Sequence, residues 1–140
     1  MTRKKGVLIM LVISITLFGL CGCNKDNQNQ QQTDKVENTY EQISHEEAKR
    51  LMDTETDYVI VDARTQEEFD QGHIEGAVLI PEYEISERAE KELPNKNQLI
   101  LVYCRSGRRS KIAAEALVEL GYTNVKEFGG IMDWPYEVVK

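Results

Sequence analysis

A cysteine followed closely by three arginines is the feature of this sequence best suited to chemistry. The segment reads Cys104-Arg105-Ser106-Gly107-Arg108-Arg109-Ser110. A thiolate is a nucleophile, and nearby cations and the N–H groups of a helix N-terminus favour its formation. Gly107 allows the loop to curl so that successive N–H groups converge on one point. We therefore expect Cys104 to be ionised at neutral pH and to act as a nucleophile.

The same segment has less reactive interpretations. An unpaired cysteine at a strand end is often a small buried hydrophobe, but burial alone does not explain three arginines within five residues of the thiol. Arg105 and Arg108 could each belong to a solvated basic turn, because residue order does not say which guanidinium points inward. The sequence predicts an anion-binding loop and leaves open which arginine contacts the anion.

The loop lies between a predicted strand and a predicted helix. Residues 99–103, Leu-Ile-Leu-Val-Tyr, are the strongest candidate for a buried strand. After the loop, a helix that ends near Gly121 has one apolar face, formed by Ala113, Ala116, Leu117 and Leu120. Cys104 is therefore expected at the carboxyl end of a strand, where ligands bind in parallel α/β sheets.

Other apolar runs and helix signals alternate along the chain. Strands are predicted at residues 58–61, 77–80 and 125–128, and a helix between about Glu84 and Leu93. Ser44 and Thr65 each begin a capping box, with a glutamate three residues later, and predict two further helices. The alternation indicates an α/β fold over residues 39–140, with a parallel sheet flanked by helices on both faces.

Three polar residues upstream of the loop are candidates for its support. Asp62 follows a predicted strand and is expected to hold backbone N–H groups or an arginine, with Arg64 as a candidate partner. His73 precedes a turn, where a hydrogen-bonded structural role is expected rather than that of a general base. We assign structural support to Asp62, Arg64 and His73.

Several segments resemble the signatures of the rhodanese-like family. Residues 61–64 (Val-Asp-Ala-Arg), Glu68-Phe69 and residues 72–77 (Gly-His-Ile-Glu-Gly-Ala) resemble its first signature, with Glu75 where the family usually has proline. Residues 103–110 resemble its active-site loop, and Phe128-Gly129-Gly130 with Trp134 resembles its closing segment. The resemblance covers almost all of residues 42–134. It implies a single parallel-sheet domain whose cysteine carries a sulfane sulfur as a persulfide.

Loop length separates this segment from a related class of enzyme. Cysteine-dependent phosphatases of the dual-specificity type carry arginine six residues after the nucleophile, where this chain has Ser110. The arginine falls one place earlier, at Arg109, and Tyr103 stands where those phosphatases usually have histidine. The loop has the length found in sulfurtransferases.

The resemblance implies a sulfurtransferase with two half-reactions. The Cys104 thiolate takes sulfur from a small anionic donor such as thiosulfate and passes it to a thiol, cyanide or protein acceptor. The expected substrate-binding residues are Arg105, Ser106, Gly107, Arg108, Arg109 and Ser110. No metal or organic cofactor is implied. Two alternatives are a non-catalytic rhodanese-like module that binds a partner or senses sulfur at the cell surface, and a cysteine enzyme that processes arsenate or phosphate esters.

The first 22 residues are expected to be a lipoprotein signal peptide. Three basic residues precede an apolar run of 14 residues from Val7 to Leu20, shorter than the roughly 20 that span a bilayer. Leu20-Cys21-Gly22-Cys23 resembles the bacterial lipobox, with Cys23 as the lipidated residue. A plain secretory signal or an uncleaved anchor is the alternative. We expect a lipid-anchored protein on the extracytoplasmic side of the cell membrane.

Composition bounds the remainder of the chain. Residues 23–38 are polar and rich in Gln and Asn, and are expected to be a flexible linker after the lipidated cysteine. The 140 residues have room for one domain, and 41% hydrophobic residues can form its core. The net charge of -7 becomes -10 when the signal, with three basic and no acidic residues, is removed. Such an acidic protein is not expected to bind nucleic acid.

Overall fold

The computed structural model describes residues 39–140, and the predicted signal (1–22), lipidation site (Cys23) and linker lie outside the described residues. The elements in chain order are β1 (Glu41–Gln42), α1 (His45–Thr54), β2 (Tyr58–Asp62), α2 (Gln66–Gln71), β3 (Ala77–Leu79), η1 (Glu82–Glu84), α3 (Ile85–Glu92), β4 (Leu99–Cys104), α4 (Arg108–Glu119), β5 (Val125–Gly130) and η2 (Ile131–Asp133). Within this part of the chain, no helix is long and apolar enough to cross a bilayer.

Five parallel strands form one sheet in the order β1-β5-β4-β2-β3. All six residues of the central strand β4 are buried, as expected for a strand covered on both faces. The chain runs outward from β2 to β3 and then returns to the other side of β2 to form β4. The carboxyl ends of β2, β4 and β5 therefore lie side by side, and Asp62, Cys104 and Gly130 end these strands.

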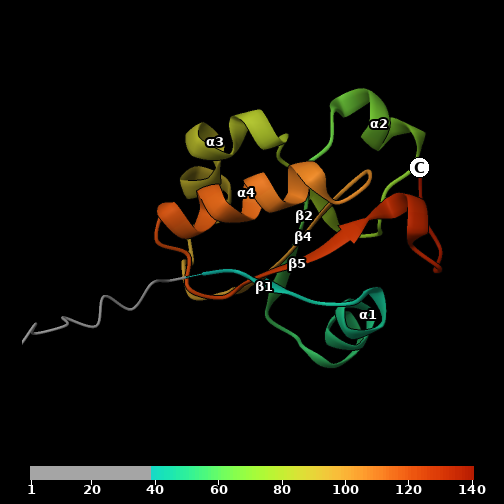
Figure 1. Cartoon of the computed structure of the whole chain (residues 1–140), viewed down its shortest axis with the longest axis horizontal. Coiled ribbons are helices and arrows are strands. Elements are labelled where there is room, and N and C mark those ends of the chain that lie inside the picture. The colour runs from blue at the N-terminus through green and yellow to red at the C-terminus, as the bar shows by residue number, and fades with distance from the viewer. Residues whose placement is uncertain (1–38) are drawn as a thin grey trace, which may run out of the picture. The chain divides into compact units, whose positions relative to one another are not determined.

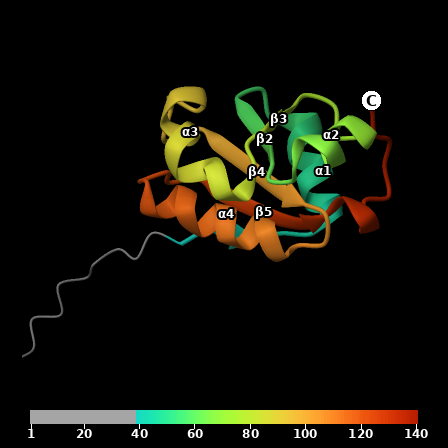
Figure 2. The ribbon, with the colours of Figure 1, turned by 90° about the horizontal axis from the view of Figure 1, so that it is seen from above.

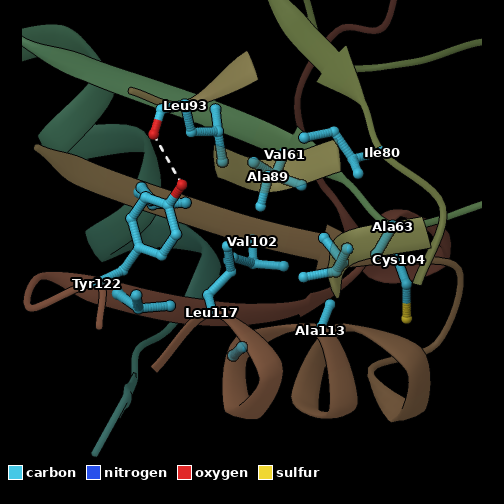
Figure 3. Packing of buried hydrophobic residues seen from close by; sticks show 14 residues of the cluster. Val61, Ala63, Ile80, Ala89, Leu93, Val102, Cys104, Ala113, Leu117 and Tyr122 are labelled. Atoms are coloured by element: carbon cyan, nitrogen blue, oxygen red, sulfur yellow. Dashed lines mark hydrogen bonds between the residues drawn. The ribbon is translucent and has the colours of Figure 1, made fainter. Parts of the chain in front are cut away.

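Helices cover both faces of the sheet, which confirms the predicted α/β architecture (Figure 1). On one face, α3 and α4 pack over a cluster that includes Val102, Leu117 and Tyr122 (Figure 3). The buried Tyr122 hydroxyl donates to the Leu93 carbonyl at 2.7 Å, which ties the end of α3 to the segment after α4. On the other face, α1 packs over a second cluster that includes Phe128.

Both predicted capping positions begin a helix, and the one at Thr65 forms the complete capping box. The Ser44 hydroxyl accepts from the Glu47 N–H at the start of α1. At the start of α2, the Thr65 hydroxyl accepts from the Glu68 N–H, while the Glu68 carboxylate accepts from the Thr65 N–H. Each side chain satisfies a backbone donor that has no partner inside the helix.

Strands β2, β3 and β4 end within one residue of their predicted ends, and the other differences from the sequence-based elements are the following. Strand β1 was not predicted because its two residues are polar and exposed, and it forms only by pairing with the edge of β5. The helix expected from about Glu84 begins as the 3-10 turn η1, before α3 takes over at Ile85. Strand β5 continues to Gly130, beyond the predicted end at residue 128.

Candidate active site

A short turn joins β4 to α4 and places the Cys104 thiol at the N-terminus of that helix. Gly107 is the residue before the helix and has φ +96°, which a residue with a side chain adopts only with strain. This conformation directs the Gly107 N–H back to Cys104 Sγ, to which it donates at 3.1 Å. Figure 3 shows the sulfur of Cys104 beside the first turn of α4. The turn therefore forms the predicted nest of N–H groups around the thiol.

The glycine pair at the end of β5 allows the loop to lie directly against this strand. Cys104 is paired with Gly130 in the sheet. A Cβ atom on Gly130 would lie 2.5 Å from Ser106 Cα, well inside van der Waals contact. A Cβ on Gly107 would already touch the Cα of Gly129 at 3.6 Å. The closing Gly-Gly segment therefore shapes the cysteine loop, although it lies 25 residues later in the chain.

Two opposing effects act on the pKa of the Cys104 thiol. Burial, which leaves the residue 1% exposed, raises the pKa by disfavouring the thiolate. Hydrogen bonds from the Ser110 hydroxyl and from the N–H groups of Ser110, Ser106 and Gly107 lower it, and together they outweigh burial. The net pKa is lowered, in the direction expected from the sequence. Hydroxyl and backbone donors, more than the arginines, produce this shift.

The three loop arginines occupy different environments. Arg109 forms two hydrogen bonds to the Glu68 carboxylate, at 2.7 and 2.8 Å, and links α4 to α2. This pairing lowers the pKa of Glu68 to about 2, against the opposing effect of burial. Within residues 39–140, no hydrogen bond or ion pair is recorded for the guanidinium groups of Arg105 and Arg108. These two cations are available to an anion, whereas most of the Arg109 charge is balanced by Glu68.

Asp62 is fully buried at the end of β2 and is the centre of a hydrogen-bonded network. Its carboxylate accepts from the Arg64 N–H at 2.9 Å and from the Arg64 guanidinium at 2.6 to 3.1 Å. The Tyr103 hydroxyl donates to the same carboxylate at 2.5 Å. Arg64 also donates to the Gly72 carbonyl at 2.7 Å. The network joins β2 to β4, one residue before Cys104, and to the end of α2.

The contacts of His73 support a structural role. Its ring stacks on Phe69 with centroids 3.7 Å apart, and Nδ1 lies 3.1 Å from the Phe69 carbonyl oxygen. Its backbone forms an antiparallel bridge with Val139 through hydrogen bonds of 2.8 and 2.9 Å. In both views, α2 lies beside the C-terminal segment that this bridge holds (Figures 1 and 2). His73 thus fastens the chain end to the segment after α2.

Two cavities flank the cysteine loop. The larger, of about 860 Å³, is lined by Ser106, Gly107 and Arg108 of the loop and by residues of α1 and β5. The smaller, of about 480 Å³, is lined by Arg105 together with Arg64 and Glu68. Cys104 is absent from the lining of both cavities. Arg105 and Arg108 therefore line different cavities, and the buried thiol lines neither of them.

Three residues of the site were missed from the sequence. Glu68 pairs with Arg109, the Tyr103 hydroxyl binds Asp62, and Glu127 accepts a hydrogen bond from Ser110 at 2.6 Å. The sequence contained a signal for Glu127. Side chains of a strand point to alternate faces, so Glu127, two residues after Val125, lies on the same inward face of the predicted strand. Among the described residues, no three His, Cys, Asp or Glu side chains gather at one point that could hold a metal ion.

The fold and site together define an α/β domain in which a buried cysteine ends a central strand, in a loop that carries two unpaired arginines. The Rhodanese-like domain family matches residues 44–136, and the chain belongs to this family. It is 42% identical over 80 residues to thiosulfate sulfurtransferase PspE of Escherichia coli, covering 57% of this chain and 77% of that protein. It is 39% identical over 99 residues to thiosulfate sulfurtransferase GlpE of Coxiella burnetii, covering 68% and 87% of the two chains.

Solved structures show the same relationship. A rhodanese from E. coli, whose structure contains anions, superimposes with a TM-score of 0.56 at 41% identity, over 59% of this chain and 98% of that one. The protein SSP1007 of Staphylococcus saprophyticus gives a TM-score of 0.64 at 28% identity, over 71% and 99%. The chain thus contains one domain of this family and is an enzyme of the sulfurtransferase class.

Proposed function

We propose that the protein transfers the sulfane sulfur of thiosulfate, or of a similar small anionic donor, to an acceptor through a persulfide on Cys104. The observation that carries this proposal is the convergence of the Ser110 hydroxyl and three loop N–H groups on the thiol. These donors stabilise a thiolate before the reaction, and the loop N–H groups stabilise the negative charge of a persulfide after it. Thiosulfate sulfurtransferases among the relatives support the choice of donor.

The first half-reaction charges the enzyme. The Cys104 thiolate attacks the outer sulfur of thiosulfate, an Sγ–S bond forms, and the S–S bond of the donor breaks with its electron pair leaving on sulfite. A thiolate and a dianion become a persulfide anion and a sulfite dianion, so charge is conserved. Arg105 and Arg108, the unpaired cations of the loop, attract the donor and stabilise the developing charge on sulfite.

The second half-reaction discharges the enzyme. A nucleophilic acceptor, such as cyanide, a small thiol or a protein thiol, attacks the outer sulfur of the persulfide, and the Cys104 thiolate leaves. The two half-reactions share one enzyme form, so initial-rate measurements should give ping-pong kinetics. The related E. coli rhodanese, whose structure contains anions, supports the choice of an anionic donor for this protein.

Competing substrates test this function directly. The full chain, purified in detergent, is assayed for thiocyanate production from thiosulfate and cyanide and for hydrolysis of a phosphate ester, alongside Cys104→Ser. We expect sulfur transfer by the wild type, no phosphate release, and loss of transfer in the serine variant. Phosphate release without sulfur transfer would replace the proposal by a phosphatase. A chain inactive in both assays would support a binding or sensing module.

We also propose that the protein is a lipoprotein attached to the extracytoplasmic side of the cell membrane. The support is the basic segment, the apolar run and the lipobox-like Leu20–Cys23 sequence. Acyl chains on Cys23 would provide the attachment, since the chain after residue 22 has a net charge of -10 and lacks a polybasic patch. The described domain, which begins at residue 39, would then be separated from the lipid by residues 24–38.

A further inference from the structure

A buried carboxylate lies directly behind the cysteine loop. Glu127 of β5 is 3% exposed, and its Oε1 accepts from the Ser110 hydroxyl at 2.6 Å and from the Gly129 N–H at 2.8 Å. Ser110 is fully buried in the first turn of α4, and its hydroxyl is one of the groups that lower the pKa of the Cys104 thiol. One serine hydroxyl therefore stands between the nucleophile and an acidic side chain that the sulfur-transfer mechanism does not otherwise use.

The Ser110 hydroxyl has a single proton and more acceptors than it can serve. Its Oγ lies 3.2 Å from the Gly107 carbonyl oxygen, 3.3 Å from that of Gly129 and 2.6 Å from Glu127 Oε1. The Cys104 thiolate is a further acceptor for the same proton. Charged acceptors form the stronger hydrogen bonds, so the carboxylate and the thiolate are the two principal competitors.

We propose that Glu127 is a positioning residue for sulfur transfer, acting through Ser110 by taking up the hydroxyl hydrogen bond when Cys104 Sγ no longer carries the negative charge. This inference rests on the proposed sulfurtransferase function. In the resting enzyme the hydroxyl is shared between Glu127 and the thiolate. When Sγ attacks the donor, the negative charge moves to the outer sulfur of the persulfide, and the hydroxyl turns to the carboxylate. The proton stays on Ser110 throughout.

Other charged groups surround this pair. The cavity that Glu127 lines is also bordered by His45 and Glu46 of α1, Arg108 and Lys111 of α4, and Asp133 of η2. On the other side, Arg109 interacts electrostatically with Cys104 and is paired with Glu68 of α2. None of these side chains hydrogen-bonds Ser110 Oγ, so Glu127 is the charged partner of this hydroxyl among the described residues.

The pH dependence of Cys104 alkylation tests the connection without any sulfur donor. The full chain in detergent is treated with iodoacetamide between pH 5 and 10, and the modification is quantified on the Cys104 peptide. We expect Glu127→Gln to lower the alkylation midpoint by about 0.5 to 1 pH unit, because the hydroxyl then donates fully to the thiolate. Ser110→Ala should raise the midpoint. Glu115→Gln, an exposed residue of α4 with the same charge change, should leave it unchanged.

Two further variants separate action through the hydroxyl from simple charge repulsion. Glu127→Asp keeps the charge but shortens the side chain, so the hydrogen bond to Ser110 is lost and the midpoint should still fall. In the Ser110→Ala background, Glu127→Gln should have little effect. A midpoint that moves only when the charge is removed, or that moves equally in the Ser110→Ala background, overturns the proposal, as does a Glu127→Gln midpoint equal to that of the wild type.

Steady-state kinetics with thiosulfate and cyanide test whether the shift in the alkylation midpoint also affects sulfur transfer. The acid limb of kcat/KM for thiosulfate should move in the same direction as the alkylation midpoint in each variant, while Glu115→Gln again serves as the control. A wild-type chain without turnover refutes the proposed function, whereas the alkylation data still report the contact between Glu127 and Ser110. An acid limb that stays fixed while the alkylation midpoint moves refutes the role of Glu127 in transfer.

Discussion

Side-chain pairing determines which of the three loop arginines are available to bind an anion. Arg109 is held by Glu68 through two hydrogen bonds, and its planar guanidinium suits this paired geometry. Among the described residues, no ion pair is recorded for Arg105 or Arg108, and these two residues line the cavities beside the cysteine loop. The sequence left open which arginine contacts the anion, because the partner of Arg109 lies 41 residues earlier in the chain.

Replacing the unpaired arginines should weaken donor binding. Arg105→Gln and Arg108→Gln should each raise KM for thiosulfate by about three- to tenfold, with a smaller change in kcat, because each removes a cation that attracts the donor. Lys91→Gln, which removes an exposed charge from α3, is the matched control and should leave KM unchanged. Steady-state kinetics at low ionic strength check this result. Equal KM values in the wild type and both arginine variants would contradict the proposed donor site.

Three strand ends, rather than one motif, form the site. Strand β4 supplies Cys104, β2 supplies Asp62, and β5 supplies Gly130 and Glu127. Apolar runs and capping boxes allowed the sheet, most helices and the place of Cys104 at a strand end to be predicted. The contacts of Glu68 and Glu127 could not be predicted in the same way, because each joins residues 17 or more positions apart whose proximity depends on strand order.

Gly130→Ala should displace the cysteine loop. The new methyl group would lie 2.5 Å from Ser106 Cα, so the backbone has to shift. We expect a loss of about 1 to 3 kcal/mol in the free energy of unfolding and a strong loss of sulfur transfer. Gly76→Ala is the control, because Gly76 has positive φ but nothing within 4 Å of an added Cβ. It should cost about 1 kcal/mol and retain activity. Denaturant unfolding and turnover measurements distinguish the two.

The Glu68–Arg109 pair between α2 and α4 should make stability dependent on pH in acid. Hydrogen bonding by Arg109 holds the pKa of Glu68 at about 2 in the folded protein, against 4.5 for an unperturbed glutamate. The Glu68 charge therefore makes its full contribution to the free energy of unfolding above about pH 4.5, and this contribution is lost as the pH falls toward 2. Both side chains are about one-fifth exposed, so we expect about 1 to 2 kcal/mol at neutral pH.

Urea unfolding of the wild type and Glu68→Gln at several pH values measures this contribution. The wild type should be more stable at pH 7, and the difference should shrink between pH 4.5 and 2. Glu67→Gln, at the adjacent exposed position of α2, should show no such change. A difference between the wild type and Glu68→Gln that is constant from pH 7 to pH 2 would show that the carboxylate charge contributes nothing.

At the scale of the whole molecule, the positive charge of the cysteine loop contrasts with the negative net charge of the chain. Removal of residues 1–22 would leave a net charge of -10, while the cysteine loop carries three arginines and no acidic residue. A small anionic donor is attracted over short distances by the loop, whereas polyanions are repelled by the chain as a whole. Attachment to an anionic membrane surface therefore has to come from the proposed lipid and not from protein charge.

Cys23→Ala should abolish lipid attachment and the processing that depends on it. The wild-type chain, expressed in bacteria, should incorporate a radiolabelled lipid precursor and sediment with membranes. Cys21→Ala should behave in the same way, because the bulky Leu20 directly before Cys21 does not fit the small residue that precedes a lipidated cysteine. The Cys23→Ala chain should remain unlabelled. Equal labelling and processing of both variants and the wild type would identify the segment as an ordinary signal or an uncleaved anchor.

The persulfide on Cys104 is the central claim, and mass spectrometry tests it most directly. The full chain in detergent is incubated with thiosulfate, cleared of it, and analysed as intact protein and as the Cys104 peptide. We predict a gain of one sulfur atom on Cys104, its loss with equimolar thiocyanate formation when cyanide is added, and no gain in Cys104→Ser. An unmodified Cys104, or a sulfur-loaded serine variant that still transfers sulfur, would contradict the mechanism.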